Sequence, residues 1–324
     1  MSNLGVVIIG RNEGERLIRC IQSLHAYIPV CVYVDSASTD GSLESAIKLG
    51  VNSIALDMSK PFTAARARNA GFETLLKLFP NIEFVQFVDG DCEVVSTWLA
   101  DATSFLDDNH QYAVVCGRRR ERCPEHSAFN LMCDVEWDTP IGDAKACGGD
   151  ALMRANAFLE IGGYRSQLIA GEEPELCVRL RESGWKIWRL GSEMTLHDAA
   201  ITKFSQWWKR TTRAGYAYAE GVSLHGSAPE YHWVAESKRS LRWGLYIPLA
   251  ILLLLIAKPV LSLMLLLLYP LQMLRLVLKS QLPFKIACLQ AFFLTIGKFA
   301  EMAGQIKFLL HRYGDKQSQI IEYK

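Results

Sequence analysis

Short apolar runs alternate with helix-like segments over the first 120 residues, and this alternation constrains the fold more than any other feature of the chain. The runs predicted as strands are 5–9, 30–34, 53–56, 83–88 and 112–117. The segments predicted as helices between them are 14–26, 42–49, 63–78 and 97–106. Buried strands that alternate with helices in this way form a mainly parallel sheet covered on both faces. The predicted fold class is therefore α/β.

Polar residues directly follow several of the predicted strands. Ligands of such sheets bind beyond the carboxyl ends of the strands. We therefore expect the functional site among Asn12, Glu13, Asp35 and the segment 89–93. The sequence contains no GxGxxG and no GxxxxGK[ST] motif, which disfavours a dinucleotide-binding or P-loop enzyme.

The pattern becomes less regular after residue 117. Residues 118–145 are rich in charge, with three consecutive arginines at 118–120, and are predicted to form an irregular excursion from the sheet. Order is expected to return with a helix near 175–183 and a strand near 186–190.

Charge is distributed unevenly along the chain. The net charge is +1, with 21% charged and 50% hydrophobic residues, which excludes a disordered chain and disfavours a nucleic-acid partner. Residues 238–324 carry twelve Lys or Arg against three acids, so this tail is basic and residues 1–237 are acidic. An acidic body with a basic, apolar tail is typical of a soluble domain attached to a membrane-associated segment.

The nine cysteines form no CxxC pair and no regular ladder of spacings. A zinc site and a disulfide framework are therefore not expected, and a reducing compartment is favoured. The first apolar run, at 6–9, is too short for a signal peptide and is interpreted as a strand.

Asp89 and Asp91 flank Gly90 at the end of the strand predicted over 83–88. Side chains two residues apart leave a strand on the same side, so the two carboxylates are expected to converge. Like charges are costly at close range unless a cation lies between them, and oxygen ligands suit Mg²⁺ or Mn²⁺. The alternative is an Asp that caps the helix that follows.

Five segments, taken in order, resemble the motifs of family 2 glycosyltransferases over roughly residues 4–225. They are VIIGRNEGERL at 7–17, VDSASTDG at 34–41, ARNAG at 67–71, VDGD at 88–91 and GEEPEL at 171–176. The resemblance implies the GT-A fold, in which a mainly parallel sheet is flanked by helices. It also implies a nucleotide-sugar donor and a divalent cofactor, Mg²⁺ or Mn²⁺.

The resemblance implies roles for the residues that follow the first strands. Asp35 would bind the base of the nucleotide, and its carboxylate can accept the imide N–H of uracil, which favours a UDP-linked donor. Asn12 and Glu13 would belong to the donor site, and Arg68 would approach the diphosphate. An Asx turn at Asp35 and a solvated helix face at Arg68 are the structural alternatives.

Further site residues follow from the same resemblance. Asp89 would lie near the ribose and the metal ion, and Asp91 would be a direct metal ligand. His197 would complete the metal shell, with a satisfied core or surface histidine as the alternative. Asp150, which follows two glycines, would hold hydroxyl groups of the donor sugar.

Glu172 and Glu173 occupy the acidic acceptor-side motif. The resemblance assigns the catalytic base to Glu173, which would activate the acceptor hydroxyl, and leaves Glu172 as the other candidate. A base beside a diphosphate is expected to have a raised pKa. The two acids also suit the N-terminus of a helix with Pro174 at its first position, and both roles are compatible.

Trp185 and Trp207 are candidates for an acceptor platform, although core packing is the alternative for each. The segment FSQWWKR at 204–210 does not match the QxxRW motif of processive synthases. This mismatch disfavours extrusion of a long polymer.

Two apolar stretches lie in the C-terminal part, at 244–257 and 260–274, with Lys258 and Pro259 between them. Each arm would span only about 22 Å, less than the ~30 Å hydrocarbon core of a bilayer. A short hairpin dipping into the bilayer, a single kinked span and a buried soluble helix pair are the three alternatives. Basic residues on both flanks favour the hairpin, 244–274, with both ends cytoplasmic.

A further helix is predicted over about 285–312. One apolar stripe at alternating spacings of four and three is formed by Phe292, Ile296, Phe299, Ala303, Ile306 and Leu310. Such an amphipathic helix suits the membrane surface or contact with the hairpin.

The chain is thus predicted to comprise a GT-A-like catalytic domain over 1–235 and a membrane-associated helical segment over 236–324. We expect metal-dependent, inverting transfer of a sugar to a hydroxyl of a saccharide or lipid-linked acceptor, in polysaccharide or glycolipid biosynthesis. The expected location is the inner or plasma membrane, in contact with its lipids, with the catalytic domain facing the cytoplasm. A nucleotidyltransferase on a related fold and a non-catalytic membrane scaffold are the alternatives.

Overall fold

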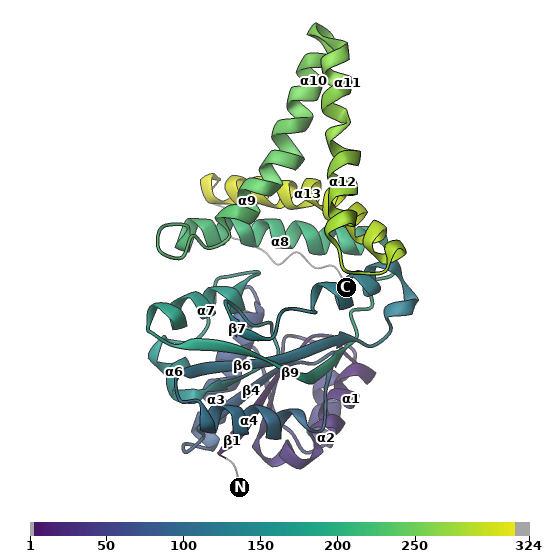
Figure 1. Ribbon diagram of the computed structural model, residues 1–324. Helices are drawn as coiled ribbons and strands as arrows, with labels where there is room; N and C mark the ends of the chain where they lie inside the picture. Colours follow the sequence, from purple (N-terminus) through teal and green to yellow (C-terminus); the bar gives the residue numbers. More distant parts are fainter. Residues whose placement is uncertain (1–2, 315–324) are drawn as a thin grey trace. The chain divides into compact units, whose positions relative to one another are not determined.

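The computed structural model describes residues 3–314 and divides into two compact units, residues 1–200 and 201–324 (Figure 1). The first unit contains every strand of the described chain, and the described part of the second is built of helices. The division lies nearer to the N-terminus than the domain boundary expected at residue 235. The reason is that the helix over residues 204–225 packs within the helical unit.

One nine-stranded sheet forms the centre of the first unit. Its strands are β1 (Leu4–Gly10), β2 (Cys31–Asp35), β3 (Asn52–Ala55), β4 (Phe84–Asp89), β5 (Cys92–Val94), β6 (Tyr112–Glu121), β7 (Gly142–Ala144), β8 (Ala151–Arg154) and β9 (Lys186–His197). They lie in the order β3-β2-β1-β4-β8-β6-β9-β5, and β7 pairs with β9. The first four strands follow the apolar runs of the sequence, which confirms the α/β class.

The sheet combines a parallel half with an antiparallel one. β3, β2, β1 and β4 are parallel neighbours, as the alternation of strands and helices predicts, and so are β6 and β9. β8 runs antiparallel to both β4 and β6, and β5 and β7 are antiparallel to β9. The register pairs Gly10 with Asp35 and Ile9 with Asp89, so the polar ends of three strands meet at one edge of the sheet.

Helices connect the strands of this unit. They are α1 (Glu15–Ser23), α2 (Ser42–Lys48), α3 (Ala64–Leu78), α4 (Trp98–Asp108), α5 (Ala128–Glu136), α6 (Ala155–Glu160) and α7 (Glu172–Glu182), with 3₁₀ turns at His25–Val30 and Pro124–His126. α3 packs against β1 and β2, and a β-carbon at Gly71 would overlap the side chain of Val7. Glycine therefore lets the helix that carries Arg68 lie close to the sheet.

The irregular excursion expected from residue 118 begins later in the structure. β6 continues through residues 118–121 and pairs with β9, which extends to His197 instead of ending near residue 190. Arg119 and Glu121 point to buried polar partners, so this stretch lacks the apolar alternation by which a strand is recognised. The expectation of irregular structure was wrong here for that reason.

The second unit consists of helices. They are α8 (Phe204–His225), α9 (Val234–Leu241), the π-helical turn η3 (Arg242–Tyr246), α10 (Ile247–Ala257), α11 (Pro259–Leu266), α12 (Leu268–Lys279) and α13 (Phe284–Tyr313). α10 and α11 form an antiparallel pair that reverses at Lys258 (Figure 1). Ser262 Oγ donates to the carbonyl of Ile251 at 2.8 Å, and Tyr269 Oη donates to that of Trp243 at 2.7 Å. The structure therefore has the expected hairpin rather than one kinked span.

The arms of the hairpin are longer than the apolar stretches indicated. Continuous helix covers Val234–Ala257, 24 residues, and Pro259–Lys279, 21 residues. At 1.5 Å per residue these helices measure about 36 Å and about 32 Å, which exceeds the ~30 Å hydrocarbon core. The expected length of about 22 Å counts the apolar stretches alone, and the first arm is longer because η3 joins α9 to α10 without a break.

Three helices of the described chain are long and apolar enough to cross a membrane, the two arms and α13. Only 11% and 6% of the apolar windows of the two arms are buried, and Ile256 is 91% exposed. Exposure of this kind does not match a buried soluble helix pair. It indicates association with a membrane.

α13 confirms the helix predicted over 285–312, but the face that packs differs from the predicted stripe. Phe292, Ile306 and Leu310 of that stripe are exposed. The buried positions are mostly small or polar: Ala287, Ala291, Thr295, Gly297, Ala300, Glu301, Gly304, Gln305 and Phe308. A β-carbon at Gly304 would overlap the backbone of Thr212 on α8, so small residues let the two helices approach closely.

Candidate active site

Asp89 ends β4 and lies at the centre of a buried ionic cluster. Its carboxylate is 2.8 Å from Arg68 Nη2 and 3.3 Å from Arg119 Nη2. Its backbone N–H donates to Asp150 at 3.0 Å. Burial opposes the charge of Asp89, but the two guanidinium groups outweigh burial and lower the pKa of this carboxyl. Asp89 is therefore ionised at neutral pH.

Arg68, on α3, links this cluster to the start of α7. The residue is 2% exposed, and its Nη1 lies 2.9 Å from Glu172 Oε1 and 3.0 Å from Glu173 Oε1. Burial opposes its charge, but the surrounding carboxylates raise the pKa of Arg68 well above its usual value. Arg68 thus does not lie on a solvated helix face, and it joins Asp89 to both glutamates of the acidic motif.

Glu173 lies in the first turn of α7, directly after Glu172. The Glu172 side chain is buried, whereas that of Glu173 is 15% exposed. Burial and the negative charge of Glu172 raise the pKa of Glu173 to about 7, against the opposing charge of Arg68. A carboxyl group that titrates near neutral pH can accept a proton as a general base. The two roles predicted for this pair, base and helix N-terminus, are compatible in this geometry.

Asp150 precedes β8 and supports the cluster from the protein interior. It is completely buried and accepts hydrogen bonds from Arg119 Nε at 3.0 Å and from Thr195 Oγ1 at 2.8 Å. Asp150 is thus surrounded by protein donors, and its expected contact with sugar hydroxyls stays a prediction. A β-carbon at Gly149 would lie 2.7 Å from Asp89 Oδ2, so glycine allows the backbone to approach the cluster closely.

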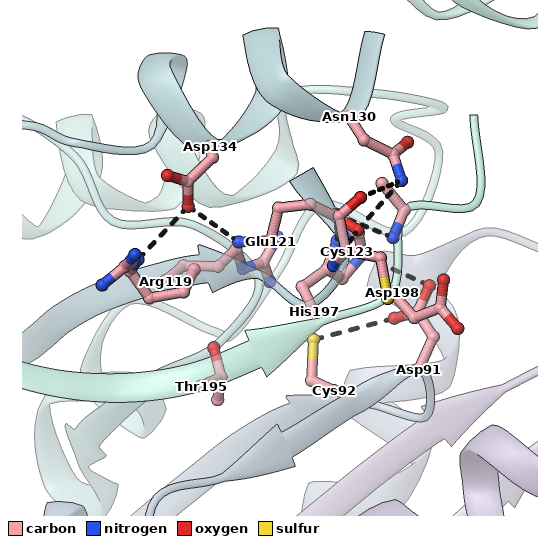
Figure 2. A network of polar contacts seen from close by, with 12 residues as sticks. Asp91, Cys92, Arg119, Glu121, Cys123, Asn130, Asp134, Thr195, His197 and Asp198 are labelled. Atoms are coloured by element: carbon pink, nitrogen blue, oxygen red, sulfur yellow. Dashed lines mark hydrogen bonds and ion pairs between the residues drawn. The ribbon is translucent and has the colours of Figure 1, made fainter. Parts of the chain in front are cut away.

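Asp91 and His197 form a second polar group, which Figure 2 shows together with Cys92. His197 is the last residue of β9, and its Nε2 lies 3.3 Å from Asp91 Oδ2. Possible ligand atoms of Asp91, Cys92 and His197 all lie within 4.8 Å of one another. Burial raises the pKa of the Cys92 thiol well above its usual value, so the carboxylate and the imidazole are the donors at neutral pH. This oxygen and nitrogen pair fits Mn²⁺.

The two aspartates of the DGD segment face different partners, although the sequence predicts that they converge. Asp89 contacts Arg68 and Arg119, whereas Asp91 lies beside His197. The group of possible metal ligands that includes Asp89 is formed with Cys92 and Asp150 instead. Because two guanidinium groups already balance Asp89, its charge does not require a cation. Direct metal ligation by Asp89 and by Asp91 stays a prediction.

The loops after β1 and β2 are joined by hydrogen bonds. The backbone N–H of Asn12 donates to Ser38 Oγ at 2.9 Å, and Asn12 Oδ1 accepts from the N–H of Thr39 at 2.7 Å. Asp35 is 3% exposed and accepts from Tyr33 Oη at 2.9 Å and from the N–H of Ser38 at 2.8 Å. The carboxylate therefore shapes its own turn, which is the structural alternative stated for Asp35. Binding of a base by Asp35 stays a prediction.

The remaining predicted contacts lie outside the cluster. Glu13 forms an ion pair with Arg16 at 2.8 Å, at the beginning of α1. Trp185 precedes the first residue of β9 and donates to Glu160 at 2.9 Å, so it lies at the opposite end of that strand from His197. Trp207, on α8, packs against Phe293 with ring centroids 4.9 Å apart. Trp185 is thus misplaced as an acceptor contact, and Trp207 has the packing role stated as its alternative.

Several residues of the site come from the segment that is predicted as irregular. Arg119 lies 5.4 Å from the ring centroid of Trp137, whose edge-to-face partner at 4.7 Å is His197. Glu121 accepts a hydrogen bond from Asn130 at 3.1 Å. One signal in the sequence could have revealed them, because every second residue of the run RRRE at 118–121 shares one face of a strand.

Comparison with known proteins finds a family model that matches part of the chain. Residues 5–138 match the family model described as Glycosyl transferase family 2. No curated protein matches the sequence. The matched segment contains all of β1 except its first residue, β2 to β6, and the residues Arg68, Asp89 and Asp91.

Several solved structures of low sequence identity are similar to this chain to different degrees. The mannosyltransferase PcManGT from Pyrobaculum calidifontis, in complex with GDP-Man and Mn²⁺, has 16% identity and a TM-score of 0.67 over 95% of this chain and 87% of that chain. S. aureus TarS 1-349 in complex with UDP-GlcNAc has 15% identity and a TM-score of 0.48 over 97% and 92% of the two chains. Glucosyl-3-phosphoglycerate synthase from Mycobacterium tuberculosis, with Mn²⁺, UDP-Glc and glycerol 3-phosphate, has 16% identity and a TM-score of 0.45 over 69% and 80%. The likeness to the mannosyltransferase establishes a GT-A-like fold.

Proposed function

We propose that this chain, whose residues 5–138 match the model of glycosyl transferase family 2, transfers a sugar from a nucleotide-sugar donor to an acceptor hydroxyl. The transfer inverts the anomeric configuration and serves the synthesis of a polysaccharide or glycolipid at a membrane. The single observation that carries the proposal is Glu173, whose pKa of about 7 suits a base and which lies 3.0 Å from Arg68 beside Asp89.

Glu173 acts as the general base of this reaction. Its ionised carboxylate takes the proton of the acceptor hydroxyl, while the acceptor oxygen attacks the anomeric carbon. The bond from that carbon to the diphosphate breaks on the opposite face, and the nucleoside diphosphate leaves with the electron pair. A single displacement needs only one base, and Arg68, which also contacts Glu172 and Asp89, holds Glu173 in place. A base with a pKa close to the working pH is the most effective.

The donor occupies the edge of the sheet where β1, β2 and β4 end. Asn12 and Asp35 shape the two loops at this edge, and Glu13 lies between them and α1. A carboxylate has about four acceptor positions, so Asp35 retains capacity for the imide N–H of uracil. The expected donor is therefore a UDP-linked sugar. GDP-linked sugars are the main competitor, since the similar mannosyltransferase was solved with GDP-Man.

Asp91 and His197 would hold a Mn²⁺ or Mg²⁺ ion, which when bound supplies positive charge to the departing diphosphate. The chemistry of the donor pair supports this assignment, because one carboxylate oxygen and one imidazole nitrogen suit Mn²⁺ better than the thiol of Cys92 would. The similar mannosyltransferase contains Mn²⁺, which supports a divalent cofactor here.

The helical unit attaches the enzyme to the inner or plasma membrane, with the catalytic unit on the cytoplasmic side. The exposed arms of the hairpin enter the lipid, and exposed basic residues stand at the outer end of each arm: Lys238, Arg239, Arg242, Arg275, Lys279 and Lys285. Basic flanks remain on the cytoplasmic side, so both ends of the hairpin are placed there. This location favours a lipid-linked or other membrane-proximal saccharide as the acceptor.

A donor panel tests the proposed reaction. Purified full-length protein in detergent is incubated with UDP- and GDP-linked sugars and MnCl₂, and the released nucleotide is identified. We expect nucleoside diphosphate, from slow donor hydrolysis without acceptor and from faster turnover with added lipid-linked saccharides. Release of pyrophosphate would identify a nucleotidyltransferase instead, and a lack of any turnover would identify a non-catalytic scaffold.

Two variants of α7 connect the panel to the site. Glu173→Gln keeps the shape of the side chain but cannot accept the proton, and we expect it to lower transfer by about 10²- to 10⁴-fold. Glu182→Gln, at the exposed end of the same helix, is the matched control and should keep full activity. Equal activity of both variants would remove Glu173 from the mechanism.

A further inference from the structure

Glu121, which the proposed reaction does not use, lies next to the predicted metal ligand His197. It is the last residue of β6 and is paired with His197, the last residue of β9, in the register of the two strands. The Glu121 side chain is completely buried. Figure 2 shows His197 lying between Glu121 on one side and Asp91 on the other.

Neutral donors hold both oxygens of Glu121. Its Oε1 accepts from Asn130 Nδ2 at 3.1 Å and from the N–H of Cys123 at 3.2 Å. Its Oε2 accepts from the N–H of Ala199 at 3.1 Å. Hydrogen bonds of this kind fix the orientation of a buried carboxyl. Glu121 is therefore a rigid acceptor with one oxygen directed at the imidazole.

The two nitrogens of the His197 imidazole lie on the sides of two different carboxylates. Nδ1 lies 3.9 Å from Glu121 Oε2, and Nε2 lies 3.3 Å from Asp91 Oδ2. The ring of Trp137 meets it edge to face, with centroids 4.7 Å apart, which restricts rotation of the imidazole. The ring therefore presents Nε2 on the side of Asp91.

We propose that Glu121 is a positioning residue, whose carboxylate, 3.9 Å from Nδ1, keeps the proton of His197 on that nitrogen so that the Nε2 lone pair faces a divalent cation shared with Asp91. A neutral imidazole has one N–H and one lone pair, and the group that binds the N–H decides which nitrogen is left as ligand. A carboxylate behind a ligating histidine commonly has this role, and its loss costs 10- to 100-fold in metal affinity. This inference rests on the proposed function, because it assumes a cation at Asp91 and His197.

Metal affinity provides the test. Mn²⁺ binding to the full-length protein in detergent is measured by electron paramagnetic resonance, alone and with saturating UDP or GDP. We expect Glu121→Gln to weaken Mn²⁺ binding by about 10- to 100-fold. In a background that already carries His197→Ala, the same substitution should have little further effect, because Glu121 acts through the imidazole.

Two further variants separate positioning from a general effect on the fold. Asp134→Asn removes a carboxylate that accepts from the backbone N–H of Glu121 at 2.9 Å, and no contact with His197 is expected to change. This control should retain wild-type Mn²⁺ affinity. Glu121→Asp keeps the charge but withdraws the carboxylate by one methylene, and it replaces Glu121→Gln if that variant does not fold. We expect an intermediate loss of affinity for it.

The outcomes distinguish the inference from the function on which it rests. If His197→Ala weakens Mn²⁺ binding and Glu121→Gln does not, the positioning role is overturned and the metal site stands. The role is also overturned if Glu121→Gln and Glu121→Asp lower only the unfolding temperature, or if Glu121→Gln costs as much in the His197→Ala background. If Asp91→Asn and His197→Ala both leave Mn²⁺ affinity unchanged, the metal site itself is wrong and the inference falls with it.

Discussion

Glu173 is expected to make the protein less stable as the pH rises from 5 to 8, and Glu173→Gln should abolish this effect. Burial and Glu172 raise the pKa of Glu173 from 4.5 to about 7. The folded state therefore binds this proton more tightly than the unfolded state, so ionisation of Glu173 favours unfolding above its unfolded pKa. A change of one pKa unit corresponds to about 1.36 kcal/mol, and most of the resulting cost of ionisation develops between pH 5 and pH 8. The stability advantage of Glu173→Gln over wild type should therefore grow by about 2.5 kcal/mol over this range.

The same ionisation is expected to increase activity over this range, because only the carboxylate can accept the proton of the acceptor hydroxyl. With a pKa of about 7, roughly one tenth of Glu173 is ionised at pH 6 and roughly nine tenths at pH 8. The value of kcat/KM should therefore rise about tenfold between these two pH values. Stability and activity should change in opposite directions because they depend on the same proton.

Two measurements check this prediction on the same samples. Thermal unfolding at pH 5, 6, 7 and 8 gives the stability difference between variant and wild type, and release of nucleoside diphosphate at pH 6 to 8 gives kcat/KM. Glu182→Gln, on the same helix, should follow wild type in both. A stability difference that does not change with pH would refute the raised pKa. An activity that is flat from pH 6 to 8 would refute the assignment of the base.

Three further perturbations follow from the packing. Arg119→Met removes the cation shared by the buried carboxylate of Asp150 and the 27% exposed carboxylate of Asp89, and it should cost about 3 to 5 kcal/mol in chemical unfolding. Arg120→Met, at a 41% exposed side chain of the same strand, should cost less than about 1 kcal/mol. Gly304→Leu places a side chain against the backbone of the neighbouring helix, and we expect denaturation followed by circular dichroism to show a loss of stability of about 1 to 3 kcal/mol or more. Leu253→Lys, at a 72% exposed position of the hairpin, should weaken the free energy of membrane binding by about 2.5 to 3.5 kcal/mol if the hairpin enters lipid, as measured by flotation with vesicles. Ile47→Lys, in the first unit, should leave membrane binding unchanged.

Local patterns were sufficient for the elements whose side chains are sorted by polarity. The strands β1, β2 and β4 are almost uniformly buried, and apolar runs between helices identify them without further information. The hairpin was predictable for the same reason, since Lys258 and Pro259 interrupt an otherwise continuous apolar segment. Failures occur where buried residues are charged, as in residues 118–121, or where the packed face is built of glycine and alanine, as on α13.

The candidate site was predictable as a set of residues but not as a set of contacts. The motifs led to Arg68, Asp89 and Glu173, and the structure brings these three together in one ionic cluster. The contacts of Asp89 and Asp150 were not predictable because their shared partner, Arg119, comes from a part of β6 that had not been predicted as strand. A carboxylate that already has a guanidinium partner no longer requires a metal ion, and only the partner reveals this.

The order of residues along the chain by itself determined the class of fold, the apolar hairpin and the identity of the acids proposed to carry the chemistry. Each of these follows from local composition, since burial of apolar runs and exposure of polar turns depend on a few neighbouring residues. Tertiary structure alone decided which acid is balanced by an arginine, which lies beside His197, and which titrates near pH 7. The reason is that charge interactions and burial depend on distances between residues far apart in the chain, and these distances exist only once the strands have paired.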